Sequence, residues 1–296
     1  MNNNPSRRSV IKNIISSVAI ISTPMTFSQV FAANEKALGT ELNGKINHSV
    51  CRWCYNTIPL EELCQAAVAM GIKSIDLQGP EEWPILKKYG LTCAMPSGAG
   101  NGISDGFNDL KLHDQLVKSY EEIFPKLKAA GLDKVICFSG NRKGMSDEQG
   151  LENCTIGLKR LMPSAEKFGI TVTMELLNSK VNHKDYMCDS TKWGVALCDS
   201  VGSEKFKLLY DIYHMQIMEG DVIATIRKYN KYFSHYHTGG VPGRNEIDDT
   251  QELYYPAIMR AIVATGYKGF VAQEFIPKRP DLIASLKQGV TICDVA

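Results

Sequence analysis

The sequence has no surplus of charge of either sign, since 33 basic residues stand against 32 acidic ones and the formal net charge is +1. After the first dozen residues it also lacks any long cluster of Lys and Arg. Proteins that bind a nucleic-acid backbone draw much of their affinity from basic side chains on the phosphates. The composition therefore predicts no nucleic-acid partner.

Three sequence patterns with well-known functions are also missing. The pair Cys51-Arg-Trp-Cys54 has no second CxxC to complete a zinc site. The glycines at 98, 100 and 102 lack the order G-x-G-x-x-G of a dinucleotide-binding turn. The nine cysteines are odd in number and irregularly spaced, which excludes a small disulfide scaffold. We expect most of them to be buried as small apolar side chains.

The N-terminus is typical of an export signal. Arg7-Arg8 precede a mostly apolar run over residues 14–31, and Val-Phe-Ala at 30–32 suits a cleavage site. Serines, a threonine and Pro24 interrupt the run, so it is a weak candidate for a membrane span of ~20 apolar residues. We predict a twin-arginine-type signal peptide at 1–33, a linker at 34–44, the twin-arginine export machinery as a partner and a periplasmic location. A disordered basic tail is the alternative.

The rest of the chain alternates short apolar runs with longer amphipathic segments. We expect strands at 45–51, 74–78, 91–96, 134–139, 171–177, 207–213, 233–238 and 269–275. We expect helices at 60–70, 82–89, 109–130, 147–168, 190–201, 221–229, 251–265 and 281–288. Eight such repeats indicate an α/β fold with parallel strands, namely a single-domain (β/α)8 TIM barrel over 45–296. An open doubly wound sheet is the rival, but the glycine-rich phosphate turn that it would need is absent.

Four of the apolar runs carry a charged or ligating residue near the expected carboxyl end of the strand, where barrel active sites lie. Buried carboxylates on neighbouring strands repel one another unless a cation lies among them. Three carboxylates and one imidazole offer mainly oxygen ligands, which favour Mn²⁺, Mg²⁺ or Co²⁺, with Zn²⁺ as an alternative. The predicted metal ligands are Glu175, Asp211, His237 and Glu274. For any one of them alone, an ordinary salt bridge would be an equally good explanation.

The segment Ser-His-Tyr-His-Thr-Gly-Gly at 234–240 contains two histidines on the same face of a strand, ~6.6 Å apart. That spacing is too wide for both to bind one small ion easily. His237 lies nearer the rim and is the expected ligand, whereas His235 is expected to pack below it or to orient it.

Three more residues near the same rim are candidate substrate contacts. His214 follows the sixth expected strand and offers a hydrogen bond to a substrate oxygen, unless it only caps a helix. Arg244, in the loop after the seventh strand, offers a planar fork for a carboxylate, although a solvated arginine fits nearly as well. Trp53 offers an apolar wall, or it only packs.

Four motifs point to a known family: Glu175-Leu-Leu-Asn, Asp211-Ile-Tyr-His-Met-Gln, Pro-Gly-Arg-Asn-Glu at 242–246 after His237, and Gly-Tyr-x-Gly-Phe-Val-x-x-Glu-Phe-x-Pro at 266–277. From about residue 45 onward the chain resembles the hydroxypyruvate isomerases, within the group of xylose-isomerase-like barrels that also holds the ketose 3-epimerases. The resemblance implies a divalent metal on Glu175, Asp211, His237 and Glu274. It also implies that the two glutamates act as acid and base on a small hydroxycarbonyl or sugar substrate.

The position of His237 keeps a second substrate class open. It is commonly glutamine in hydroxypyruvate isomerases and histidine in the sugar epimerases. A ketose 3-epimerase or an enzyme that processes 3-keto-glycosides is therefore the alternative to a hydroxypyruvate-type isomerase. A non-catalytic periplasmic sugar-binding protein is a further alternative, and a homo-oligomer is left open. An endonuclease on the same barrel would call for more histidines around several zinc ions.

Overall fold

The computed structural model describes residues 42–296. The predicted signal peptide and most of the predicted linker lie outside these residues, so both stay predictions. Within the described part, no helix is long and apolar enough to cross a membrane.

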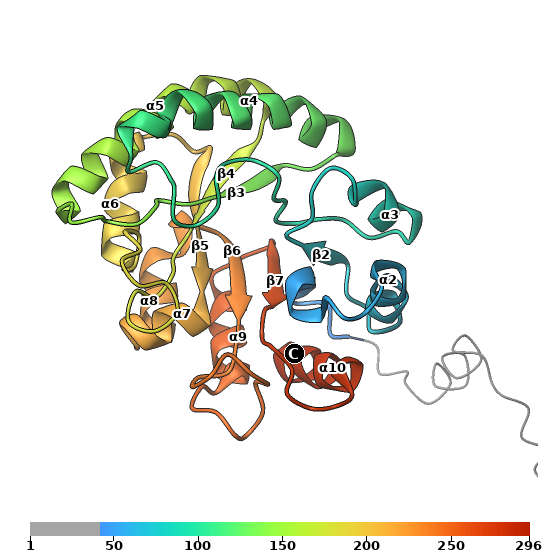
Figure 1. Ribbon diagram of the computed structural model, residues 1–296. Coiled ribbons are helices and arrows are strands. Elements are labelled where there is room, and N and C mark those ends of the chain that lie inside the picture. The colour runs from blue at the N-terminus through green and yellow to red at the C-terminus, as the bar shows by residue number, and fades with distance from the viewer. Residues whose placement is uncertain (1–41) are drawn as a thin grey trace, which may run out of the picture. The chain divides into compact units, whose positions relative to one another are not determined.

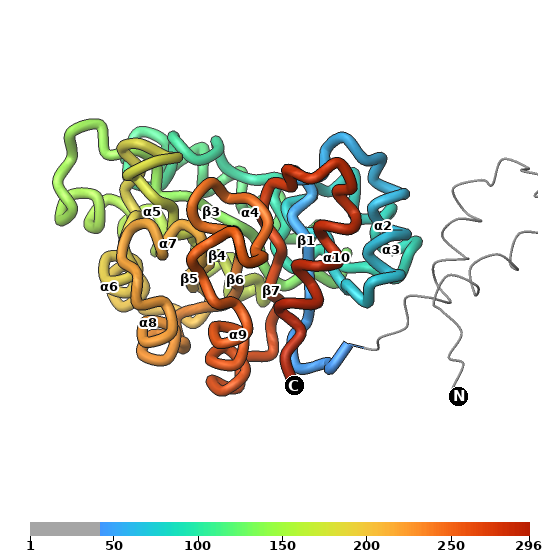
Figure 2. Tube along the Cα trace, turned by 90° about the horizontal axis from the view of Figure 1, so that it is seen from below, coloured from blue at the N-terminus to red at the C-terminus, as the bar shows by residue number. Residues whose placement is uncertain are grey.

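Parallel strands form the wall of a TIM barrel, which confirms the predicted fold class (Figure 1). The order of the seven strands in the sheet is β2-β1-β7-β6-β5-β4-β3. Strands β1 and β7, from opposite ends of the described chain, pair side by side (Figure 2). The strands are β1 (Asn47–Cys51), β2 (Ser74–Asp76), β3 (Lys134–Cys137), β4 (Thr171–Glu175), β5 (Phe206–Asp211), β6 (Phe233–Thr238) and β7 (Phe270–Gln273).

The eighth strand, expected at 91–96, is not regular in the structure. The segment lies between β2 and β3 and makes a single isolated bridge, from Thr92 to Ser74. Its carbonyl groups still accept hydrogen bonds on both sides, from the backbone N–H of Leu77 (2.8 Å) and of Ile136 (3.0 Å). An irregular segment thus completes the barrel wall. The structure has seven regular strands in residues 42–296, one fewer than expected.

Helices follow the strands and cover the outside of the barrel (Figure 1). Their residues are α2 (Leu60–Ala69), α3 (Trp83–Lys88), α4 (His113–Ala130), α5 (Asp147–Phe168), α6 (Thr191–Val201), α7 (Ile212–Met218), α8 (Val222–Tyr229), α9 (Tyr255–Ala264) and α10 (Leu282–Cys293). Three 3₁₀ helices add to them, at Arg52–Tyr55, Leu110–Leu112 and Asn230–Tyr232. All expected helices are present with shifts of a few residues at their ends.

Helix α7 is the one α-helix in the described region that the sequence pattern did not predict. The expected strand 207–213 is too long at its end, because β5 stops at Asp211 and α7 begins at the next residue. The side chain of Asp211 accepts a hydrogen bond from the backbone N–H of His214 (2.9 Å) and so caps the new helix. This cap turns the chain sharply at the rim and keeps His214 beside the strand end.

Candidate metal centre and active site

Four strand-end side chains converge on one point of the barrel rim. Glu175 is the last residue of β4, Asp211 the last of β5, His237 lies on β6 and Glu274 directly follows β7. In the sheet register Asp211 pairs with His237, so neighbouring strands bring their ends to one level. One ligand atom from each of the four lies within 4.8 Å of the others, and all four residues are buried. The structure thus assembles the side chains that were predicted to hold a metal.

The imidazole of His237 turns one nitrogen toward the carboxylates. Its Nδ1 atom lies 2.7 Å from Glu274 Oε2 and 3.2 Å from Glu175 Oε1. Burial disfavours charge on this ring, but Glu274 and Glu175 outweigh burial and raise the pKa of His237 well above its usual value. Positive charge is therefore favoured at this point of the cluster.

The three carboxyl groups differ in their electrostatic surroundings. Burial, reinforced by Glu274, raises the pKa of Glu175, and burial raises the pKa of Asp211 well above its usual value despite the nearby Arg244. Burial also acts on Glu274, but there Arg244 and His237 outweigh it and bring its pKa well below the usual range. The cluster thus disfavours three full negative charges unless further positive charge is present.

The residues present fit a divalent ion. Glu175 Oε1 is buried and, although it lies 3.2 Å from His237 Nδ1, it has no partner in hydrogen-bond geometry. An orphaned carboxylate oxygen of this kind is costly to bury, and a metal ion would satisfy it. Three carboxylates and an imidazole suit Mn²⁺, Mg²⁺ or Co²⁺, and zinc less well.

Arg244 lies deeper than a solvated loop residue. Its Nη2 atom is 2.6 Å from Glu274 Oε2 and 3.3 Å from Asp211 Oδ2. The guanidinium carbon lies 5.1 Å from the ring centre of Trp53 and 5.3 Å from that of Tyr213. Arg244 therefore supplies a fixed positive charge to two predicted metal ligands, in addition to facing the cavity.

A tight glycine turn brings Arg244 back to the rim. A Cβ atom on Gly240 would lie 2.3 Å from the carbonyl oxygen of Glu246, so the close approach of the two loop segments requires glycine. The backbone N–H of Arg244 donates to the carbonyl of Gly240 (2.8 Å). At Gly239, both the N–H and the carbonyl bond to the hydroxyl of Tyr255, each at 2.8 Å. The buried tyrosine thus anchors the start of the loop.

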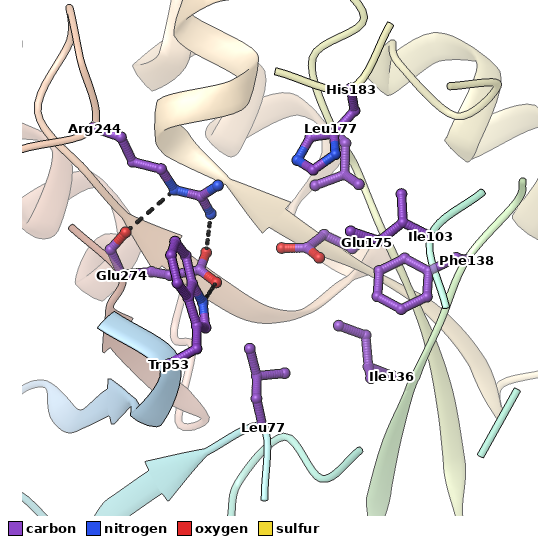
Figure 3. Close-up of a pocket in the computed structure, with 10 residues that line it drawn as sticks. All are labelled: Trp53, Leu77, Ile103, Ile136, Phe138, Glu175, Leu177, His183, Arg244 and Glu274. Atoms are coloured by element: carbon purple, nitrogen blue, oxygen red, sulfur yellow. Dashed lines mark hydrogen bonds and ion pairs between the residues drawn. The ribbon is translucent and has the colours of Figure 1, made fainter. Parts of the chain in front are cut away.

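A cavity of about 330 Å³ opens beside the cluster. Glu274 and Glu175 reach toward each other from opposite sides of it, and Trp53 lies against Arg244 and Glu274 (Figure 3). The indole Nε1 of Trp53 donates to Glu274 Oε1 at 2.7 Å, so Trp53 orients this carboxylate as well as forming a wall. The other walls are mainly apolar. The lining residues are Trp53, Leu77, Ile103, Ile136, Phe138, Glu175, Leu177, His183, Arg244 and Glu274.

His214, a predicted substrate contact, is fully buried and is not among the residues that line the cavity. Its Nδ1 accepts a hydrogen bond from the backbone N–H of Asn178 (3.2 Å), which leaves the proton on Nε2. That Nε2 has no hydrogen-bond partner and lies 3.7 Å from Asp211 Oδ2. In this structure His214 therefore faces a predicted metal ligand rather than the cavity.

Sequence reasoning missed His183, which lines the cavity and packs on His214 with ring centres 5.2 Å apart. Its place in the loop after β4 was the available signal, since these loops form barrel active sites.

His235, expected to support the site, is buried and donates from Nε2 toward Asp76 Oδ2 at 2.6 Å. All nine cysteines are free and eight are buried, which confirms their expected role; Cys54 is partly exposed.

The comparisons with known proteins agree with this architecture. The family model described as xylose isomerase-like TIM barrel matches residues 63–290. The chain belongs to this family. A 2-oxo-tetronate isomerase of Cupriavidus necator is 34% identical over 110 residues, which cover 37% of this chain and 42% of that protein. The hydroxypyruvate isomerase of Escherichia coli is 30% identical over 155 residues, which cover 51% of this chain and 58% of that protein.

These matched segments thus span less than two thirds of both relatives. Among solved structures of this barrel type, the 3-keto-D-glucoside 4-epimerase of Escherichia coli superposes with a TM-score of 0.70. It is 16% identical, and the match covers 83% of this chain and 98% of that one. At that sequence identity, the structural similarity supports the fold alone.

Proposed function

We propose that this protein is a metal-dependent isomerase that moves a carbonyl group between adjacent carbons of a small hydroxycarbonyl compound, through an enediolate. The observation that carries the proposal is the cluster of Glu175, Asp211, His237 and Glu274 at the mouth of the barrel, with both glutamates in the wall of one cavity. The hydroxypyruvate and 2-oxo-tetronate isomerases among its relatives support this reaction class.

The reaction requires one carbon to lose a proton and its neighbour to gain one, while a hydroxyl proton passes to the former carbonyl oxygen. We assign the transfer of the carbon-bound proton to Glu175 and Glu274, which reach the cavity from opposite sides (Figure 3). A divalent ion held by the four clustered residues would supply Lewis-acid stabilisation of the negative charge that develops on the substrate oxygens. Trp53 holds Glu274 in place through its indole N–H.

Arg244 supports a substrate with a carboxylate. Its Nε and Nη2 atoms bond to Glu274 and Asp211, whereas its Nη1 atom has no hydrogen bond within residues 42–296. The residue lines the cavity, so the free N–H groups of Nη1 are the donors that a substrate carboxylate would meet. This favours an acid such as hydroxypyruvate or a 2-oxo-tetronate.

The second candidate is a ketose 3-epimerase or an enzyme that acts on 3-keto-glycosides. Such an enzyme would use the same two glutamates to enolise its substrate, and the apolar side of the cavity favours a sugar substrate. Leu77, Ile103, Ile136 and Phe138 form a surface suited to the C–H face of a sugar ring. The imidazole of His237 in the ligand set, typical of the sugar epimerases, also supports this candidate. Export through the twin-arginine pathway, which we propose from Arg7-Arg8, would place either activity in the periplasm.

Solvent-deuterium incorporation tests both candidates and separates them from a non-catalytic sugar-binding protein. Hydroxypyruvate, a 2-oxo-tetronate, several ketoses and a 3-keto-glycoside are incubated in D₂O with chelated protein and with protein resupplied with Mn²⁺, and deuterium is located by NMR. We expect exchange at the carbon next to a carbonyl only with Mn²⁺, and losses of about 100-fold or more in Glu175→Gln and Glu274→Gln. Binding of a sugar without exchange in any member of the panel would contradict an enzymatic role.

A further inference from the structure

The second nitrogen of His237 points away from the carboxylate cluster. While Nδ1 faces Glu274 and Glu175, Nε2 lies 3.6 Å from Cys51 Sγ and 4.0 Å from Asp76 Oδ2. Cys51, Asp76 and His237 are all fully buried. The ring therefore lies between two sets of acceptors, and only one nitrogen of a neutral imidazole carries a proton.

The carboxylate of Asp76 is held by donors from several strands. Its Oδ1 atom accepts from Ser49 Oγ (2.7 Å), Ser74 Oγ (2.9 Å) and the backbone N–H of Met95 (3.3 Å). Its Oδ2 atom accepts from His235 Nε2 (2.6 Å). These donors fix the side chain and leave Oδ2 as the oxygen nearest to His237.

His235 strengthens this arrangement through its ring position. Its centre lies 5.2 Å from that of His237, with the ring planes at 85°. This edge-to-face contact restricts rotation of the His237 ring. The direction of Nε2 toward Asp76 and Cys51 is thus built into the packing below the rim.

We propose that Asp76 is a positioning residue, whose carboxylate keeps the proton of His237 on Nε2 and so presents the Nδ1 lone pair to a metal ion. The inference rests on the metal site of the proposed function and adds a residue to it. Asp76 Oδ2 lies 4.0 Å from His237 Nε2, beyond hydrogen-bond distance, so the carboxylate acts on the ring through its negative charge. Losing a carboxylate that bonds directly to a metal-bound histidine typically weakens metal binding 10- to 100-fold, and the lower end of that range is expected for this longer contact.

A second metal ion in place of this role is disfavoured, although Cys51, Asp76 and His237 also offer atoms within 4.8 Å of one another. Coordination of a metal here would also require His237 to turn Nε2 to this ion while Nδ1 faces Glu274 and Glu175. Four hydrogen-bond donors already converge on Asp76. The group acts as an acceptor site rather than as a metal site.

The variant Asp76→Asn tests the role of the negative charge on Asp76. The backbone N–H of Met95 requires an acceptor on the Oδ1 side, so the amide oxygen stays there and the NH₂ group replaces Oδ2. The NH₂ group then faces His235 Nε2, which can accept its hydrogen bond once the proton of His235 moves to the unpartnered Nδ1. The negative charge that favoured a proton on His237 Nε2 is lost at the same time. We expect Mn²⁺ to bind about 10-fold more weakly, measured by electron paramagnetic resonance of free Mn²⁺.

Ser49→Ala is the matched control, because it removes a hydrogen bond from Oδ1 of the same carboxylate and leaves Oδ2 in place. We expect Ser49→Ala to keep Mn²⁺ affinity within about 3-fold of the unmodified protein, since Oδ2 still faces His237. Equal losses of affinity in both variants would show that Asp76 acts only through the fold, and unchanged affinity in Asp76→Asn would overturn its role directly.

A measurement on the unmodified protein gives an answer even if Asp76→Asn does not fold. In Zn²⁺-loaded protein labelled with ¹⁵N-histidine, we expect NMR to show His237 ligated through Nδ1 and protonated on Nε2. Ligation through Nε2 would overturn the inference and leave the proposed function standing. Unmodified protein that binds neither Mn²⁺ nor Zn²⁺ would overturn the proposed metal site and this inference together.

Discussion

The anchor of the Arg244 loop can be tested by removing a single oxygen atom. Tyr255 is 1% exposed, and its hydroxyl donates to the carbonyl of Gly239 and accepts from its N–H, each at 2.8 Å. Tyr255→Phe leaves both buried backbone groups without this partner, at about 1–3 kcal/mol for each unsatisfied group. Because water and loop relaxation recover part of this loss, we expect the free energy of unfolding to fall by about 2–4 kcal/mol. For a domain of this size, that lowers Tm by roughly 5–15 °C.

Urea unfolding followed by circular dichroism, with the protein held in chelator, measures this change without a contribution from metal binding. Tyr254→Phe is the matched control, because the neighbouring tyrosine is 67% exposed. We expect it to change the free energy of unfolding by no more than about 0.5 kcal/mol. A loss in Tyr255→Phe as small as that of the control would refute the assigned anchoring role, provided that the denaturant slope is unchanged.

Three further predictions concern metal, pH and export. Mn²⁺ at 100 times its dissociation constant is expected to stabilise the chelated protein by about 2.7 kcal/mol and raise Tm by roughly 5–10 °C in calorimetry, whereas Asp211→Asn should show little response at the same concentration. Burial lowers the pKa of His48 to about 4, against the opposing effect of Asp294. Between pH 6.5 and 4 the unfolded state therefore binds more protons than the folded state, and up to about 3 kcal/mol of the free energy of unfolding should be lost as the pH falls through this range. Urea titrations at a series of pH values should show that His48→Gln removes this loss. Replacing Arg7 and Arg8 by Lys should stop export, as seen by cell fractionation, and unchanged export would refute the predicted signal.

The regular elements could be predicted where their end signals are local in sequence. Helix α5 spans the expected residues, because Ser146 caps its start and Gly169 ends it with φ 75°. The expected strand 233–238 coincides with β6, although a register shift near Leu208 and Leu209 lies in the neighbouring strand. Such signals need no knowledge of distant residues.

The prediction of a strand at 91–96 was wrong because backbone N–H groups of this segment bond to side chains that are distant in the sequence. The N–H of Ala94 donates to Ser74 Oγ (2.7 Å) and that of Met95 to Asp76 Oδ1 (3.3 Å), so these groups do not join a regular ladder. Helix α7 was missed for another reason. Asp211 ends a strand and caps a helix at once, and a charged residue in an apolar run was interpreted only as a site residue.

The four clustered residues could be named because strand ends of a parallel barrel meet at one rim. Their neighbours could not be named in the same way. The ion pairs of Arg244 depend on a loop that folds back through Gly239 and Gly240. The position of Asp76 near His237 depends on the barrel bringing β2 close to β6, which is three places away in the sheet. Both contacts join residues that only the closed barrel brings together.

The most direct test of the central claim is an anomalous-difference map from a Mn²⁺-soaked crystal, recorded near the manganese absorption edge. The account predicts a peak coordinated by carboxylate oxygens of Glu175, Asp211 and Glu274 and by Nδ1 of His237. A well-occupied Mn²⁺ peak elsewhere in the barrel, or none at these four residues under saturating Mn²⁺, would contradict it.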